Sequence, residues 1–251
     1  GYFQKLNSKI NMKTIWIIAK RELEIFFDSL IAYIILGLFL GFSGFFTWLY
    51  GNDIFLVGQA NLRIFFNIAS WSLFFFIPAI TMKMLAEERK TGTLELLLTK
   101  SVSDRQLILG KFLGSVLLVC IALLATLPYV ITVSSIGNLD NGGTICGYFG
   151  LLLMSITYTA IGIFASSITT NQIVAFMTAL FIGLFFHIIF GVLAQNFTGS
   201  IGQIFETLNL QSHFESISRG VIDSKDLVYF LSITFLGLYL GESSLSKRHS
   251  S

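Results

Sequence analysis

Two residues of this chain could perform covalent chemistry together, because a serine and a histidine lie at comparable depths in predicted membrane helices. Ser43 lies within Gly41-Phe42-Ser43-Gly44, and His187 lies in a later apolar segment. A nearby imidazole activates a serine hydroxyl as a nucleophile, so this pair would suit an intramembrane serine protease. Similar depth is the only support for this pairing. A hydrogen bond from His187 to a Ser or Thr of a neighbouring helix is the simpler interpretation.

The glycines around Ser43 have a structural interpretation as well. Gly37, Gly41 and Gly44 form a stripe of small residues, and the first two have the Gly-x-x-x-Gly spacing. Small residues at this spacing let two helices approach closely in lipid. We therefore predict that these three glycines form a helix-packing site.

The chain has no motif for binding a nucleotide or a metal. No G-x-x-x-x-G-K-[ST] loop is present to hold phosphates. The three histidines are isolated, and Cys120 and Cys146 lie at different predicted depths, so no metal site or disulfide follows. We predict a chain with no catalytic residue, no cofactor and no nucleic-acid partner.

The composition indicates an integral membrane protein. Hydrophobic residues make up 54% of the chain and charged residues 12%, against about 25% charged residues in soluble domains. A bilayer core of about 30 Å needs about 20 apolar residues per helix. Six segments qualify in an all-α domain over 30–246, although the sixth has only 15 residues before Glu242 and is short unless its helix continues. The segments are Leu30–Tyr50, Ile64–Met82, Phe112–Ile136, Thr144–Ile168, Ile173–Ala194 and Leu227–Gly241.

The distribution of positive charge predicts the orientation. Only Arg63, Arg219 and Lys225, of 16 Lys and Arg residues, lie outside the amino-terminal segment, the loop after the second span and the carboxyl tail. These regions are therefore predicted to be cytoplasmic, with both termini inside. We expect the first span to be retained rather than cleaved as a signal peptide. Residues 1–11 are expected to be an unstructured extension and 247–251 a tail.

Residues 12–29 are predicted to form an amphipathic helix on the membrane surface. At 100° per residue the apolar face and the charged face separate, so the aromatic side would enter the acyl boundary and the basic side would meet lipid headgroups. The apolar face holds Ile15, Trp16, Ala19, Leu23, Phe26 and Phe27, and the other holds Lys13, Lys20, Arg21, Glu24 and Asp28.

The loop over 83–111 combines ten charges with a run of leucines. Gly92 is suited to end a helix that extends the second span, and Thr93 to cap a short new helix carrying the leucines. Ser103 and Gln106 form a capping box for the helix that leads into the third span. The leucines either pack internally or face another protein, and the residues alone leave the two equal.

The segment over 195–226 is predicted to lie on the outer side. It has few charges and alternates apolar and polar residues. Irregular backbone at membrane depth must be buried in protein, so we expect short re-entrant or interfacial helices there.

Three stretches resemble a known family. Glu87-Glu88-Arg89-Lys90-Thr91-Gly92-Thr93-Leu94-Glu95-Leu96-Leu97-Leu98-Thr99 resembles the coupling-helix signature of type 2 ABC transporter permeases. Ala165-Ser166-Ser167-Ile168-Thr169-Thr170-Asn171-Gln172-Ile173-Val174-Ala175-Phe176 and Ser216-Ile217-Ser218-Arg219-Gly220-Val221-Ile222-Asp223 are similar to the gliding-motility permease subunit, GldF, of Bacteroidota.

The resemblance implies an inner-membrane permease that pairs with a second permease subunit, with an ATPase dimer that uses ATP and Mg docked on the short helix. Leu94, Leu97 and Leu98 would enter a groove of the ATPase, and Glu87, Glu88 and Arg89 would line its rim.

The alternative functions are a secondary transporter or channel, and then the protease. A secondary transporter should have ionisable residues inside its spans, where the sequence predicts only His187. The transported substrate is not encoded in a recognisable site. Spans lined by Phe, Leu, Gly, Ser and Thr favour an apolar or lipid-linked cargo.

Overall fold

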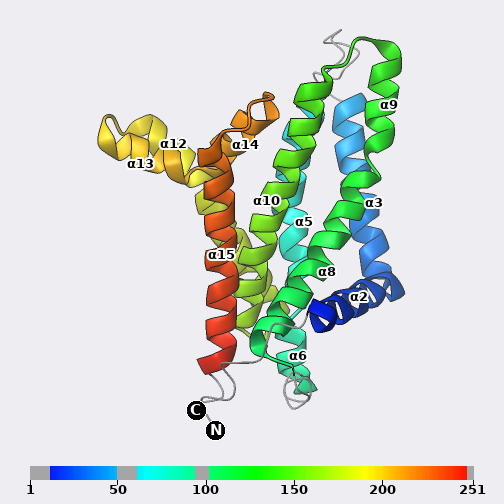
Figure 1. The fold of residues 1–251 in the computed structure, drawn as a ribbon, viewed down its shortest axis with the longest axis vertical. Coiled ribbons are helices and arrows are strands. Elements are labelled where there is room, and N and C mark those ends of the chain that lie inside the picture. Colours follow the sequence, from blue (N-terminus) through cyan, green and yellow to red (C-terminus); the bar gives the residue numbers. More distant parts are fainter. Residues whose placement is uncertain (1–11, 50–60, 94–101, 248–251) are drawn as a thin grey trace.

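The computed structural model describes residues 12–49, 61–93 and 102–247, and every regular element in these ranges is a helix (Figure 1). The helices are α2 (Met12–Asp28), α3 (Leu30–Trp48), α5 (Arg63–Thr81), α6 (Ala86–Thr91), α8 (Asp104–Leu124), α9 (Leu127–Ile136), α10 (Asn141–Ser167), α11 (Gln172–Leu184), the π-helical turn η1 (Phe185–Ile189), α12 (Phe190–Asn196), α13 (Ser200–Leu208), α14 (Leu210–Ser218) and α15 (Ser224–Ser246).

Within the described ranges, six continuous helical stretches are long and apolar enough to cross a membrane, as the sequence predicted. They are Leu30–Trp48, Arg63–Thr91, Asp104–Ile136, Asn141–Ser167, Gln172–Asn196 and Ser224–Ser246. The sixth helix continues beyond Glu242 to Ser246 and has 23 residues. At about 1.5 Å per residue it exceeds the bilayer core of about 30 Å, so it is not too short to cross.

Helix α10 is the centre of the bundle. It packs against α5, α8, α11, α14 and α15 (Figure 1). By contrast, α3 stands at the edge, and most of its large apolar side chains are exposed. An exposed apolar helix is stable in lipid, where the hydrocarbon tails cover it.

Polar side chains set the helix boundaries. Asp140, Asn171 and Asp223 each accept a hydrogen bond from a backbone N–H at the start of α10, α11 and α15. The predicted capping box of Ser103 and Gln106 is confirmed at the start of α8. These side chains satisfy backbone donors that have no partner within the first turn of a helix.

The bundle has two distinct ends. Helix α2 runs across the end that carries α6, and a hydrogen bond of 3.0 Å from Ser246 to Asp104 brings the end of α15 there (Figure 1). We call this the α6 end. At the opposite, α14 end, the segment between the last two spans forms α13 and α14, which confirms short helices there. Which end faces the cytoplasm, and whether α13 and α14 cover an exit, remain predictions.

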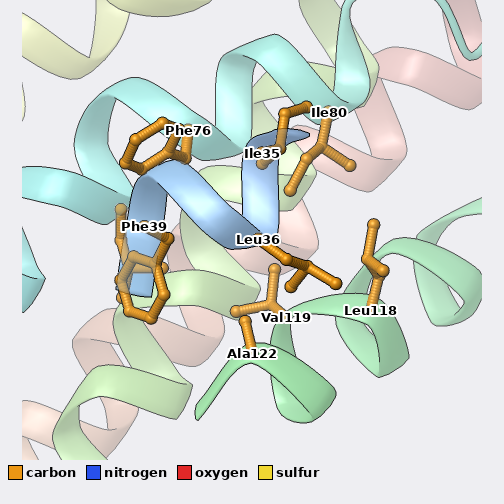
Figure 2. Close-up of a pocket in the computed structure, with 9 residues that line it drawn as sticks. Ile35, Leu36, Phe39, Phe76, Ile80, Leu118, Val119 and Ala122 are labelled. Atoms are coloured by element: carbon orange, nitrogen blue, oxygen red, sulfur yellow. The ribbon is translucent and has the colours of Figure 1, made fainter. Parts of the chain in front are cut away.

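A small apolar pocket lies between α3, α5 and α8 (Figure 2). Its walls carry no charged or hydrogen-bonding side chain, so it offers nothing to orient a polar ligand. The lining residues are Ile35, Leu36, Phe39, Leu73, Phe76, Ile80, Leu118, Val119 and Ala122.

The glycines predicted to pack helices do so only in part. A Cβ atom added to Gly44 would lie 2.7 Å from the Tyr129 hydroxyl, but nothing lies within 4 Å of one added to Gly37 or Gly41. Among the described residues the stripe therefore has a close neighbour only at Gly44, and packing of the other two glycines against another subunit stays a prediction. The tighter contacts occur elsewhere: at Gly162, an added Cβ would lie 2.8 Å from Thr81 Cβ and still closer to its hydroxyl.

This difference predicts opposite outcomes for two matched substitutions. Gly162→Ala should lower the free energy of unfolding by about 1–3 kcal/mol, because the added methyl group forces buried Thr81 to move. Gly41→Ala should leave it unchanged or slightly raised, because its methyl group meets open space. Unfolding of the purified chain in detergent measures both, and equal effects would contradict the packing described above.

Candidate functional site

The predicted extension of the second span is confirmed by α6. After α5 ends at Thr81, the chain makes one turn and continues as α6, which stops at Gly92. Gly92 has a φ of 71°, a left-handed conformation that glycine adopts without steric cost. The segment that carries the leucines begins immediately after this stop.

Helix α6 is held at its start by α10. The hydroxyl oxygen of Ser166 accepts hydrogen bonds of 3.0 Å from the backbone N–H groups of Leu85 and Ala86. The same hydroxyl donates to the carbonyl of Met82 at 3.0 Å. One serine thus satisfies three backbone groups of the turn between α5 and α6.

The carbonyl of Ser167, at the end of α10, attaches α6 a second time. Arg89 of α6 donates from Nη1 to the carbonyl of Ser167, and Ser244 of α15 donates to the same carbonyl at 3.2 Å. Carbonyls at the end of a helix have no partner within the helix, so side chains of neighbours can bind them. Ser167 therefore joins α6 to α15.

A buried lysine forms the centre of the site. Lys111 Nζ on α8 lies 2.8 Å from Glu22 Oε1 on α2 and 2.8 Å from Glu88 Oε1 on α6. The side chain of Lys111 is 1% exposed, Glu22 8% and Glu88 16%. Charges removed from water to this degree require partners of opposite sign. We call these three residues the Lys111 cluster.

Close packing of α2 on α8 makes the cluster possible. Added Cβ atoms at Gly110 and Gly114 would lie 2.6 Å from Ile18 and 2.8 Å from Glu22. These glycines have the Gly-x-x-x-Gly spacing and allow the backbones to approach. The carboxylate of Glu22 can then reach Lys111. Helix α2 also contacts the turn before α6, where the ammonium of Lys83 lies 5.4 Å from the centre of the Phe26 ring.

Buried polar contacts link α6 to several other helices. Helix α6 is attached to α2 and α8 through the Lys111 cluster and to α10 through Ser166 and Ser167. A force applied to α6 must therefore move these helices with it or break buried polar contacts.

The three charged residues predicted to line the rim of the ATPase contact have different surroundings in the structure. Glu87 is exposed, but Glu88 binds Lys111 and Arg89 binds Ser167 within the chain. Glu88 is thus paired within this chain, with 16% of its side chain exposed, and a role for Glu88 and Arg89 at the rim of an ATPase contact stays a prediction. Leu94, Leu97 and Leu98, with the predicted helix after Gly92, lie outside the described residues.

The apolar face of α2, predicted to enter the lipid, packs largely against the protein. Ile15, Ala19 and Phe26, predicted to face lipid, are buried in the protein, whereas Trp16 is exposed. Much of the apolar face is thus used for contact with α8. Placement of α2 at a membrane surface remains a prediction.

The structure does not bring together the two residues of the protease hypothesis. The hydroxyl of Ser43 bonds to the carbonyl of Leu40 at 3.4 Å. His187 bonds through Nδ1 to the Tyr158 hydroxyl at 2.8 Å and stacks on Phe74. His187 has a polar partner on a neighbouring helix, as expected, but this partner is a tyrosine rather than a Ser or Thr.

Sequence reasoning missed Glu22 and Lys111. Each is a single charged residue within the apolar face of its helix. Their opposite charges were the signal that could have suggested the pairing. Lys111 and Asp226 also lie inside α8 and α15 and are buried, so His187 is not the only ionisable residue within the long apolar helices. The predicted span boundaries, at Phe112 and Leu227, had excluded each by one residue.

Comparison with known proteins adds one finding. A family model described as ABC-2 family transporter protein matches residues 8–242 of the chain. No curated protein matches it. The matched range contains α6, the Lys111 cluster and both serines at the end of α10.

The cluster predicts a large effect for one substitution. Lys111→Met keeps a long side chain but leaves Glu22 and Glu88 without their cation, so the free energy of unfolding should fall by about 3–5 kcal/mol. Adding Glu22→Gln and Glu88→Gln should recover much of the loss, because no unpaired charge then remains buried. Denaturation of the purified chain tests this. A single variant as stable as the natural chain, or a triple variant no better than the single one, would contradict the assignment.

Proposed function

The chain belongs to the ABC-2 family of transporter proteins, as a multi-pass membrane permease subunit of an ABC transporter, and from this premise we propose how it works. We propose that it couples ATP hydrolysis by a separate ATPase subunit to movement of a substrate, or to energy transduction, across the bacterial inner membrane. The observation that carries this proposal is the attachment of α6 to three other helices, directly before the leucine segment.

The proposed contact is the segment after Gly92. Leu94, Leu97 and Leu98 enter a groove of the ATPase, and Glu87 is the exposed charge beside it. Glu88 and Arg89 act inside the permease, where they hold α6 in place. The ATP and Mg belong to the partner subunit.

The proposed motion follows from the attachments of α6. Closing of an ATPase dimer displaces the leucine segment and α6 together. The Lys111 cluster passes this displacement to α2 and α8, and Ser166 and Ser167 pass it to α10 and α15. Such rigid displacement of packed helices is a common way to switch between two arrangements.

We further propose a gliding-motility type of permease, because the stretches over 165–176 and 216–223 resemble that subunit. It would work beside a second permease subunit, identical or related. An apolar or lipid-linked cargo suits spans that expose mainly aliphatic and aromatic side chains. With the positive charge concentrated at the α6 end, that end would face the cytoplasm.

The leucine segment provides the direct test. Replacing Leu97 and Leu98 with Ala should strongly reduce co-purification of the ATPase and its stimulation by the permease. Burying each leucine contributes roughly 1.5–3 kcal/mol to a contact, so losing both weakens binding by at least about a hundredfold. The permease is co-expressed with its ATPase, and insertion in the membrane is confirmed first.

Leu236→Ala is the matched control, because Leu236 is 53% exposed on α15, far from α6 along the chain. It should keep ATPase binding at the level of the natural chain. If the Leu97 and Leu98 variant also does so, the leucines pack internally and the docking proposal fails.

A further inference from the structure

A buried histidine in the fifth span has one ring nitrogen without a partner. His187 lies in η1 and is 3% exposed. Its Nδ1 shares a hydrogen bond of 2.8 Å with the Tyr158 hydroxyl of α10. Its Nε2 is buried and has no hydrogen-bond partner within the described ranges. A buried polar atom that stays unpaired lowers stability, so its presence here points to a partner that is not always bound.

The backbone around His187 is unusual as well. Four buried residues of this span are spaced by four positions, namely Ala175, Ala179, Gly183 and His187. An α-helix turns about 40° too far at each such step, because it has about 3.6 residues per turn. The π-helical turn η1 closes its hydrogen bonds over five residues instead of four and offsets part of this drift. It therefore helps to direct His187 into the bundle, and such turns are frequent at functional sites.

The imidazole has aromatic neighbours on α5. It stacks on Phe74 with 5.2 Å between the ring centres, and the Trp71 ring lies nearly perpendicular to it with 4.6 Å between the centres. Phe74 and Tyr158 are almost fully buried, whereas Trp71 is 38% exposed. Among these ring contacts, Trp71 is therefore the one that a molecule from outside the chain can displace to reach the imidazole.

The chemistry of the site favours a hydroxyl group as the ligand of Nε2. The Tyr158 hydroxyl can donate to Nδ1, which leaves Nε2 as a donor, or accept from Nδ1, which leaves Nε2 as an acceptor. A hydroxyl group both donates and accepts, so it can bond to Nε2 in either tautomer. A charged head group would need a countercharge. The hydrogen-bond and ring contacts of His187 in the described chain come from Trp71, Phe74 and Tyr158, which offer none.

We propose that Nε2 of His187 binds an uncharged hydroxyl group of an amphipathic, lipid-like cargo molecule. Trp71 and the exposed Phe75, which contacts Phe74, provide aromatic surface for the apolar part of that molecule. The site lies between α5 and η1, within stretches that are long and apolar enough to cross a membrane. The inference rests on the proposed transport function and names its class of cargo. Binding requires neither the ATPase nor ATP, so a failure here is distinct from a failure of the coupling proposal.

Fluorescence of Trp71 in the full chain in lipid nanodiscs tests this assignment. Trp16→Phe and Trp48→Phe leave Trp71 as the single tryptophan. The first probe is 1,2-dioctanoylglycerol, which has one free hydroxyl, and the matched control is 1,2-propanediol dioctanoate, which lacks only that hydroxyl. The first should change the emission saturably and bind about threefold to tenfold more tightly than the second, which is the effect of one neutral hydrogen bond. Dioctanoyl phosphatidic acid, with its anionic head group, should bind no more tightly than the control diester.

Two substitutions of His187 separate binding from structure. The amide of His187→Asn lies near the position of Nδ1, so it can keep the bond to Tyr158 without a polar group at the position of Nε2. The longer side chain of His187→Gln places its amide near the position of Nε2 instead. His187→Gln should therefore keep the preference for dioctanoylglycerol, and His187→Asn should bind the two diesters equally.

Three results would overturn the proposal. The first is equal binding of the two diesters to the single-tryptophan chain that retains His187. The second is tighter binding of phosphatidic acid than of dioctanoylglycerol. The third is a preference for dioctanoylglycerol that persists in His187→Asn, or that is lost from both variants, because His187 would then act only through packing. The comparison of the two diesters on the chain that retains His187 decides the question by itself if a substituted chain does not insert in the membrane.

Discussion

The burial of Lys111 is the constraint on which the α6 end depends. An ammonium that is 1% exposed is stable only with carboxylates beside it, and these come from α2 and α6. Glu22 and Lys111 are 89 positions apart in the sequence. The need to pair one charge therefore holds α2, the first turns of α8 and α6 in a single arrangement.

Elements set by local chemistry were predictable from the sequence. The six long apolar segments, the stop at Gly92 and the capping box of Ser103 and Gln106 each depend on neighbouring residues alone. A helix requires only apolar length to cross lipid, and a cap only a suitable side chain within a few positions. The sixth span was underestimated because its apolar run stops before Glu242, whereas the helix starts at Ser224 and continues past that charge to Ser246.

Contacts between distant helices could not be predicted in the same way. Gly37 and Gly41 have the same spacing as Gly110 and Gly114, yet in the described part of the chain only the second pair is contacted by another helix. Spacing shows that a close approach is possible, and tertiary structure decides whether a partner is present. The same holds for His187 and Tyr158, and for Glu88, whose surroundings depend on α8.

The central claim is that α2 and α6 move as one body because Lys111 joins them. Its most direct test is the distance between spin labels on exposed Arg21→Cys and Lys90→Cys, with Cys120 and Cys146 replaced by Ala, in the complex with its ATPase. The distance should be the same with and without ATP, and its distribution should broaden when Lys111, Glu22 and Glu88 are replaced by Met, Gln and Gln. A distance that changes on ATP binding in the otherwise natural chain would show that the cluster breaks during the cycle and would contradict the account.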